Sequence, residues 1–187
     1  MIKLEDIHDT MYRNISDLDL KRYFPETGNP NDNVIKYNEL SEINSLNEIL
    51  PNDKSFKIVL IEDSYNKGHW CAILRSGKTY IWFDSYGLEP DGELKFINAI
   101  QKKLLGQDKK YLTHLLNKLP KGTKKIWNKK KLQKIKNGSN TCGRWCILFI
   151  ILVRDFNFTL EEFQSFIKRW SDKLNLSTDE LVSLWVQ

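Results

Sequence analysis

The strongest constraint on the fold lies between residues 140 and 153. The segment Asn140-Thr141-Cys142-Gly143 leads into an unbroken apolar run of eight residues, Cys146 to Val153. The run is far shorter than the roughly 20 residues of a membrane span, and it is typical of a helix buried in a core. Cys142 then falls in the first turn, where unpaired N–H groups and the helix dipole lower the pKa of a thiol. The sequence therefore predicts a central buried helix with a reactive cysteine at its start.

The sequence predicts a structural role for each of the residues around this cysteine. Either Asn140 or Thr141 is expected to cap the helix. Gly143 has no Cβ, so another backbone segment can approach closely there, and we expect it beside a bound substrate. Cys146, one turn further along the helix, is predicted to be a core residue, as is Cys71 in an apolar strand.

Upstream residues supply what a thiol nucleophile needs: a base, a carboxylate that orients the base, and a donor for the oxyanion. His69 lies in an apolar strand, and Asp84 closes the next one, so its carboxylate is expected to reach the imidazole Nδ1–H across a hairpin. Gln133 is expected to hold the oxyanion together with the backbone N–H of Cys142. Trp70 either packs over the site and excludes water or is a core residue, as a tryptophan in a strand is by default.

The other two histidines, His8 and His114, lie in polar segments and are expected on the surface.

Hydrophobic periodicity and turn signals predict an α+β fold, with a small mixed sheet flanked by helices. Capping-box pairs, Thr159 with Glu162 and Ser177 with Glu180, indicate two closing helices. Strands are predicted at residues 55–61, 69–75, 79–83 and near 124–133. Further helices are predicted at 2–13, 16–23, 40–50, 94–105 and 109–119, and a loop at 25–33.

Length and cysteine content bound the class of protein. The 187 residues suit one domain, 1–187, that buries a core without disulfides. Three cysteines are too few for a disulfide framework, and their spacing gives no zinc site, so no metal is expected. We expect a soluble, intracellular monomer that does not bind membranes. Residues 1–36 form an N-terminal segment to which the sequence assigns no role.

A lysine-rich insertion is predicted at residues 101–136. It holds 13 lysines and one acidic residue, a local charge of +12 in a chain of net charge +5. Such a block attracts polyanions through phosphate contacts, or simply keeps a loop solvated. Lysine without arginine favours diffuse attraction over the recognition of bases. The candidate nucleic-acid contacts are Lys121, Lys124, Lys125, Lys129, Lys130 and Lys131.

Four motifs in order resemble the adenain-like cysteine proteases, a group that also includes the proteases of ubiquitin-like modifiers. They are His69-Trp70, Phe83-Asp84-Ser85-Tyr86-Gly87, Leu132-Gln133, and Ser139-Asn140-Thr141-Cys142-Gly143. Within this group, the four motifs most resemble those of the maturation proteases of virophages, Polinton/Maverick elements and large DNA viruses. Two features depart from the pattern: the nine-residue step from Gln133 to Cys142 is long, and the sequence before Tyr37 has no match.

The resemblance implies a papain-like site in permuted order, with His69 as general base and acid, Asp84 as orienting carboxylate, Gln133 as oxyanion donor and Cys142 as nucleophile. It implies cleavage of viral precursor proteins after small residues such as Gly-Gly or Gly-Ala, in the host cell during assembly or in the virion. No cofactor is required by this chemistry. The resemblance also makes DNA, through the lysine-rich region, or a peptide a candidate activator.

Three alternatives to a maturation protease stay open at this point. A protease that removes ubiquitin-like or SUMO-like modifiers would use the same chemistry on a folded partner. An acetyltransferase could use the same triad on a thioester, but 187 residues leave little space for its nucleotide-binding region. A non-catalytic binding module would not need His69, Asp84 and Cys142 together.

Overall fold

The computed structural model describes residues 4–25, 33–134 and 138–187. Most of the loop predicted at 25–33, the first residues of the helix predicted at 2–13, and residues 135–136 of the lysine-rich region lie outside the described residues. No helix in the described ranges has the length and apolar character of a membrane span.

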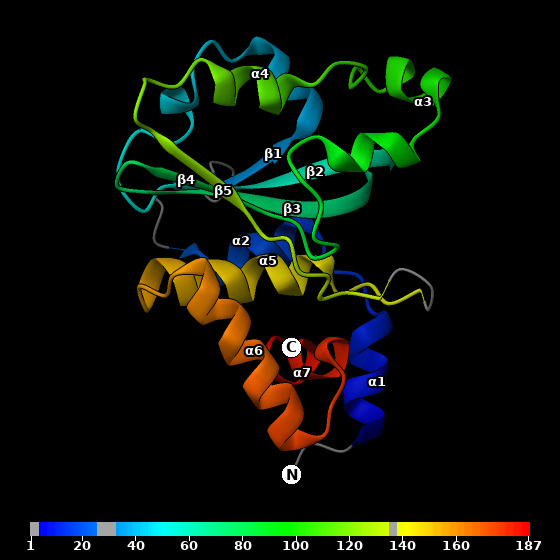
Figure 1. Cartoon of the computed structure of the whole chain (residues 1–187). Helices are drawn as coiled ribbons and strands as arrows, with labels where there is room; N and C mark the ends of the chain where they lie inside the picture. The colour runs from blue at the N-terminus through cyan, green and yellow to red at the C-terminus, as the bar shows by residue number, and fades with distance from the viewer. Residues whose placement is uncertain (1–3, 26–32, 135–137) are drawn as a thin grey trace.

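A five-stranded mixed sheet crosses the middle of the molecule in the order β1-β2-β3-β4-β5 (Figure 1). The three central strands are antiparallel, whereas β1 runs parallel to β2 and β5 runs parallel to β4. The predicted α+β class with a mixed sheet is thereby confirmed. The strands are β1 Val34–Lys36, β2 Phe56–Ser64, β3 Lys67–Ser76, β4 Thr79–Phe83 and β5 Lys124–Trp127.

Helices cover both faces of the sheet, and each face has its own hydrophobic cluster. The lower face in Figure 1 is covered by α5 and α2, with α6, α7 and α1 beneath them. The upper face is covered by α4 and by short 3-10 helices. The helices are α1 Leu4–Tyr12, α2 Asp17–Tyr23, η3 Tyr37–Glu42, η4 Leu46–Glu48, η5 Gly92–Phe96, α3 Ala99–Leu104, α4 Tyr111–Asn117, α5 Cys142–Ile150, η6 Ile151–Asp155, α6 Leu160–Leu174 and α7 Thr178–Trp185.

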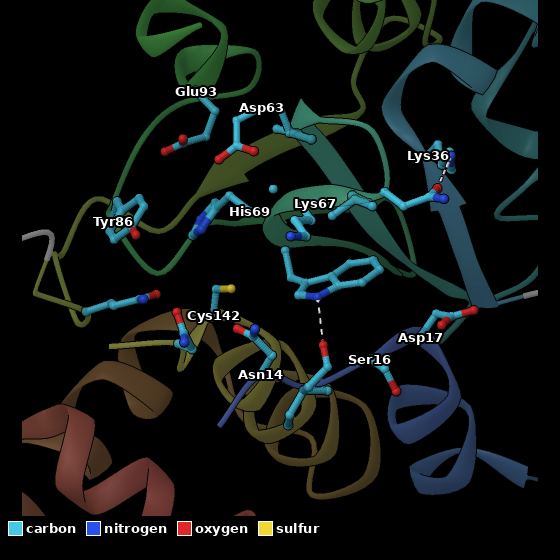
Figure 2. Close-up of a pocket in the computed structure, with 18 of the residues that line it drawn as sticks. Asn14, Ser16, Asp17, Lys36, Asp63, Lys67, His69, Tyr86, Glu93 and Cys142 are labelled. Carbon is cyan, nitrogen blue, oxygen red and sulfur yellow. Dashed lines mark hydrogen bonds between the residues drawn. The ribbon is translucent and has the colours of Figure 1, made fainter. Parts of the chain in front are cut away.

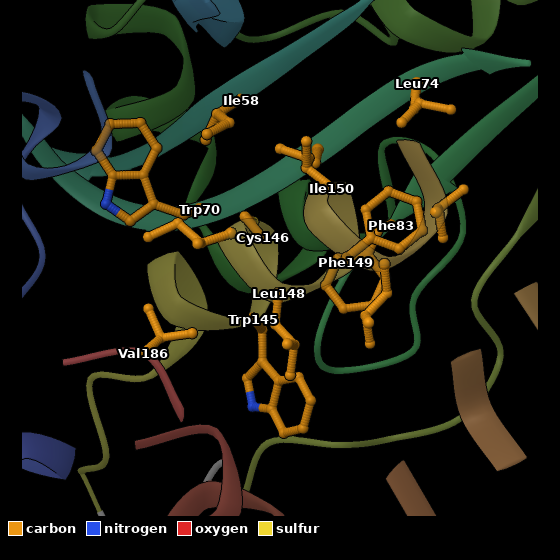
Figure 3. Close-up of a cluster of buried hydrophobic side chains, with 14 of the residues drawn as sticks. Ile58, Trp70, Leu74, Phe83, Trp145, Cys146, Leu148, Phe149, Ile150 and Val186 are labelled. Atoms are coloured by element: carbon orange, nitrogen blue, oxygen red, sulfur yellow. The ribbon is translucent and has the colours of Figure 1, made fainter. Parts of the chain in front are cut away.

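The predicted central helix is confirmed as α5, which the π-helical turn η6 extends. From Gly143 to Ile150 every residue of α5 is buried. Figure 3 shows Phe149 packed on Phe83 of β4, with ring centroids 4.5 Å apart. Cys146 is fully buried in the same cluster, as predicted. The apolar run therefore fixes how the start of α5 meets the sheet.

Two predicted helices are wrong, and in each case a polar residue caps a new helix inside the predicted one. Between 40 and 50, the side chain of Ser45 accepts a hydrogen bond from Asn47 N and starts η4. Between 94 and 105, Asn98 accepts one from Gln101 N at 2.9 Å and starts α3. Short polar side chains compete for backbone N–H groups in this way.

The other predicted elements fare better. The strands at 55–61, 69–75 and 79–83, the helices at 16–23 and 109–119, and both closing helices with their capping boxes are confirmed. The strand near 124–133 ends at Trp127, and β1 was not predicted. Within the lysine-rich region, β5 joins the sheet and α4 buries Leu112, Leu115 and Leu116.

Replacing Phe149 by alanine tests whether the packing of α5 on the sheet stabilises the fold. A buried Phe→Ala change removes apolar contacts and leaves a cavity, so we expect a loss of about 3–5 kcal/mol in the free energy of unfolding, measured by denaturant titration. The control is Phe156→Ala, where the side chain is 64% exposed and a change of less than about 0.5 kcal/mol is expected. Equal losses in the two variants would contradict this assignment of the core.

Candidate active site

A cleft of about 950 Å³ opens where β3 begins, between the N-terminal segment, the β2–β3 turn and the start of α5 (Figure 2). His69 comes from β3 and Cys142 from the first residue of α5, so the cleft joins the sheet to the buried helix. Gln133 also lines it. The structure thus brings three of the four predicted site residues to one cleft, with the fourth, Asp84, directly behind His69.

Asp84 lies immediately after β4, and its carboxylate reaches back to the neighbouring strand. The Nε2 atom of His69 is 2.9 Å from Oδ1 of Asp84, and both side chains are almost completely buried. The predicted pairing is therefore present, but the predicted ring nitrogen is wrong, since Nε2 rather than Nδ1 meets the carboxylate. Nδ1 is left as the ring nitrogen that faces the Cys142 thiol.

Tyr86, which the sequence reasoning missed, fixes the plane of the imidazole. Its ring stacks on that of His69, with centroids 4.3 Å apart and an interplanar angle of 11°. The backbone N–H of Tyr86 donates to Asp84 Oδ1 at 2.7 Å. The tight turn that follows β4 therefore supports both members of the pair, and its signal in the sequence was the Asp84-Ser85-Tyr86-Gly87 turn itself.

The thiol of Cys142 has a lowered pKa although Cys142 is partly buried. Burial alone would raise the pKa of this thiol, but the hydrogen bond and charge of His69 outweigh it. The backbone N–H groups of Trp70 and Gly143 stabilise the thiolate further. The cysteine is therefore placed to ionise as one half of an ion pair.

His69 is the other half of that pair. Burial lowers the pKa of its imidazole, but the hydrogen bonds to Asp84 and to Cys142, together with their charges, raise the pKa to about 10. At neutral pH the ring therefore holds its proton beside the thiolate. An imidazolium in this position can give a proton to a leaving group, and the neutral ring can take one from water.

Gln133 is held rigidly at the edge of the site. Its Oε1 accepts from the hydroxyl of Ser85 at 2.7 Å, and its Nε2 donates to the carbonyl of Ser139 at 2.8 Å. These bonds fix which end of the amide carries the N–H groups and use one of the two on Nε2. The second N–H is free of this pairing, so the orientation suits an oxyanion donor.

Asp179 in the first turn of α7 ties down both ends of the loop from Gln133 to Cys142. Its carboxylate accepts from Thr141 Oγ1 at 2.6 Å and from Lys134 N at 3.0 Å. Thr141 does occupy the N-cap position of α5, but its side chain binds Asp179 and makes no capping hydrogen bond, contrary to the prediction. Sequence spacing gave no sign that α7 restrains this loop.

The N-terminal segment forms one wall of the cleft. Trp70 is 9% exposed, and its indole N–H donates to the carbonyl of Ile15 at 3.2 Å. A Cβ on Gly143 would lie 3.1 Å from Ile15 and 3.4 Å from Trp70. The neighbours of Gly143 are therefore two side chains and not the backbone segment that the sequence predicted there. Arg144 secures the segment by donating to the carbonyl of Arg13 at 2.7 Å.

Three of the six predicted nucleic-acid contacts line a groove that is separate from the cleft. Lys124, Lys125 and Lys129 line a groove of about 600 Å³ beside β5 and the start of α6, together with Lys54. None of these four lysines lines the cleft that holds Cys142. All six predicted contacts are exposed: Lys121, Lys124, Lys125, Lys129, Lys130 and Lys131.

One set of side chains has the composition of a metal site. The ligand atoms of His69, Cys71 and Asp84 lie within 4.8 Å of one another. Burial raises the pKa of the Cys71 thiol well above its usual range, and the imidazole and carboxylate already bind each other. A metal would have to ionise that thiol and break that bond, so the set fits a buried His69–Asp84 hydrogen-bonded pair better than a metal centre. His8 and His114 are exposed, as predicted.

The sequence is 31% identical over 152 residues to the uncharacterized protein V9 of Sputnik virophage, a match that covers 81% of this chain and 83% of V9. The chain belongs to the V9 family. This relationship confirms the virophage part of the resemblance identified in the sequence. Among solved structures, the SUMO protease Ulp1 with its catalytic cysteine oxidized to a sulfenic acid has a TM-score of 0.42 and 15% identity, over 97% of this chain and 81% of that one. No protein-family model matches the sequence.

Alkylation tests the His69–Cys142 pair without any substrate. Because His69 lowers the pKa of the Cys142 thiol, we expect iodoacetamide to modify Cys142 with a pH midpoint below the usual value of about 8.5, followed by peptide mass spectrometry. His69→Ala should raise that midpoint. Cys71 and Cys146 are buried and serve as internal controls that stay unmodified in the folded protein. The same midpoint with and without His69 would contradict the ion pair.

Proposed function

We propose that this chain is a cysteine endopeptidase that cleaves viral precursor proteins, such as capsid or virion components, during maturation. The observation that carries the proposal is the His69 imidazole held between the Asp84 carboxylate and the Cys142 thiol in a peptide-sized cleft. Membership of a virophage protein family supports a viral setting. The enzyme would act in the host cell during assembly or inside the virion.

In the proposed mechanism, the Cys142 thiolate attacks the scissile carbonyl carbon, and a carbon–sulfur bond forms as the carbonyl oxygen takes the negative charge. The His69 imidazolium, held in orientation by Asp84, then gives its Nδ1 proton to the departing amine as the carbon–nitrogen bond breaks. The products of this half are a thioester on Cys142 and a free amino terminus.

The second half returns the enzyme to its starting state. Neutral His69 takes a proton from water, and the hydroxide attacks the thioester carbonyl. The carbon–sulfur bond breaks, the acid product leaves, and the thiolate and imidazolium form again. In both halves the oxyanion is held by the backbone N–H of Cys142, which lies in the open first turn of α5, and by the second N–H of Gln133.

The proposed preference for Gly-Gly or Gly-Ala sites comes from the resemblance, and the residues beside the nucleophile support it. Trp70 and Ile15 lie over Gly143, next to Cys142. Trp70 and Ile15 also line the cleft that holds Cys142, so they limit the space for a substrate side chain beside the nucleophile, and glycine needs the least. Trp70 is therefore the proposed substrate-binding residue. Gly143, which was expected beside a bound substrate, is buried under Ile15 and Trp70 and does not line the cleft.

Cleavage of a diverse peptide library, followed by mass spectrometry, tests the activity and the role of Gln133 together. We expect cleavage after pairs of small residues, no cleavage by Cys142→Ala, and a kcat about 10²–10³ lower in Gln133→Ala, as for other losses of one oxyanion donor. Gln101→Ala on α3 is the matched control and should keep its activity, because Gln101 is exposed and does not line the cleft.

Two results would count against this proposal. Cleavage that persists in Cys142→Ala would remove the thiol from the mechanism. Activity confined to folded ubiquitin-like precursors, with none on peptides or viral precursors, would replace the maturation protease by a modifier protease with the same chemistry.

We further propose that the lysines of the groove beside β5 bind the DNA backbone and that DNA, or an activating peptide, stimulates an enzyme whose chemistry requires no cofactor. The support is the cluster of the exposed Lys124, Lys125 and Lys129 with the half-buried Lys54. The groove is separate from the cleft, so bound DNA would leave the cleft open to a substrate. We propose that the enzyme works as a monomer that does not bind membranes.

Salt dependence tests the DNA contact. We expect the affinity for labelled duplex DNA, measured by fluorescence anisotropy, to fall steeply with salt, and the log–log slope to become less steep by about 0.9 for each phosphate that a variant no longer binds. Lys124→Ala with Lys125→Ala should therefore reduce the slope. The matched control is Lys168→Ala with Lys173→Ala on α6. A flat salt dependence, or equal effects of both pairs, would mean that the lysines only keep the surface solvated.

A further inference from the structure

Asp84 orients His69 through one of its two carboxylate oxygens. The other oxygen receives no hydrogen bond from His69 or Cys142. Asp84 is completely buried, and its Oδ1 accepts from His69 Nε2 at 2.9 Å and from Tyr86 N at 2.7 Å. Its Oδ2 is also buried but has no hydrogen-bond partner among the donors of the described residues. A buried carboxylate oxygen without a hydrogen-bond donor destabilises the folded protein, so a donor to Oδ2 of Asp84 is expected nearby.

The group placed to donate to this oxygen is a second carboxyl group, that of Glu93 in η5. Glu93 is 7% exposed, its carboxyl lies within hydrogen-bond reach of Asp84, and its Oε1 is buried without a donor in the described part of the chain. Figure 2 shows Glu93 entering the cleft from the side opposite Cys142, above His69 and Tyr86. Two ionised carboxylates in contact repel each other strongly, so such pairs share one proton.

The buried carboxylate of Asp91 holds Glu93 in this position. Asp91 precedes η5 in the left-handed conformation, with a φ of 64°. It accepts from the hydroxyl of Tyr37 at 2.6 Å and from Thr113 N at 2.9 Å, which anchors the start of η5 to the upper core. The position of Glu93 is therefore built into the fold.

We propose that Glu93 is a positioning residue that holds a proton and donates it in a hydrogen bond to Oδ2 of Asp84, so that a carboxyl pair orients the His69 imidazole. This inference rests on the proposed function, because it assigns a further residue to the same site. Glu93 does not need to touch the substrate. It acts through Asp84 by supplying the donor that Oδ2 lacks.

The charges around Glu93 make its proton labile near neutral pH. Burial raises the pKa of its carboxyl, the charge of His69 opposes this, and Asp84 adds to the rise, which brings the pKa to about 7. Above that pH the hydrogen bond breaks and two carboxylates face each other. The titratable groups that face Glu93 or line the same cleft are His69, Cys71, Asp84, Tyr86, Lys95, Asp63, Lys67, Lys36, Asp17 and Cys142.

Two substitutions separate the donor from the charge. Glutamine keeps a donor to Oδ2 and cannot ionise, whereas alanine removes the donor. We expect Glu93→Ala to lower kcat about tenfold at pH 6, and Glu93→Gln to recover most of that activity. The ratio of kcat in Glu93→Gln to kcat in the natural protein should then rise between pH 6 and pH 8. Equal kcat in both variants, or a ratio that does not change with pH, would overturn the inference.

NMR of the imidazole gives a measurement that does not depend on catalysis. The chain has three histidines, so the ¹³Cε1 signal of His69 can be assigned with His8→Gln and His114→Gln variants. We expect this signal to shift with a midpoint near pH 7 as Glu93 loses its proton, and the shift to be absent in Glu93→Gln. A signal that stays constant through pH 7 in both proteins would overturn the role of Glu93 and leave the ion pair intact. A midpoint near pH 6.5 in both would mean that His69 itself titrates, which would also remove the ion pair from the proposed mechanism.

Discussion

The burial of α5 against the sheet is the constraint on which the site depends. The apolar residues from Cys146 onward pack beneath β3 and β4, with Phe149 stacked on Phe83. This packing fixes the first turn of the helix at the edge of the sheet, beside the start of β3, so Cys142 and His69 meet there although 73 residues separate them in the chain. The same packing leaves the first N–H groups of the helix directed at the cleft.

Burial also sets the electrostatics of the site. Taken alone, burial would raise the pKa of Cys142 and lower that of His69, and would keep both groups neutral. The two groups reverse these effects in each other because their charges are opposite and in contact, and Asp84 adds a further negative charge on the far side of the ring. The imidazolium is stabilised while the pH lies below its raised pKa of about 10, and the thiolate while the pH lies above its lowered pKa. The ion pair is therefore favoured between these limits.

The sequence predicted the parts of the site that are local to one element. A cysteine at the start of an apolar helix, a histidine in a strand and an aspartate at the end of the next strand are visible in one dimension because helix burial and strand alternation leave periodic patterns. The tertiary contacts that hold the site in place leave no such periodic pattern in the sequence. Asp179 restrains the Gln133–Cys142 loop from 37 residues beyond the cysteine, and Ile15 contributes its carbonyl to Trp70 from the N-terminal segment, to which the sequence assigned no role. The ring nitrogen facing Asp84 depends on the side-chain torsions of His69, which spacing does not encode.

The most direct test of the proposed chemistry is the capture of its covalent intermediate. The protein would be mixed with an activated ester of a peptide ending in Gly-Gly, quenched in acid within seconds, and analysed by intact-mass and peptide mass spectrometry. The account predicts an added mass equal to the acyl group, located on Cys142, that disappears at later times and is absent in Cys142→Ala. Hydrolysis of the ester with no adduct on Cys142, at the same rate in Cys142→Ala, would contradict the account.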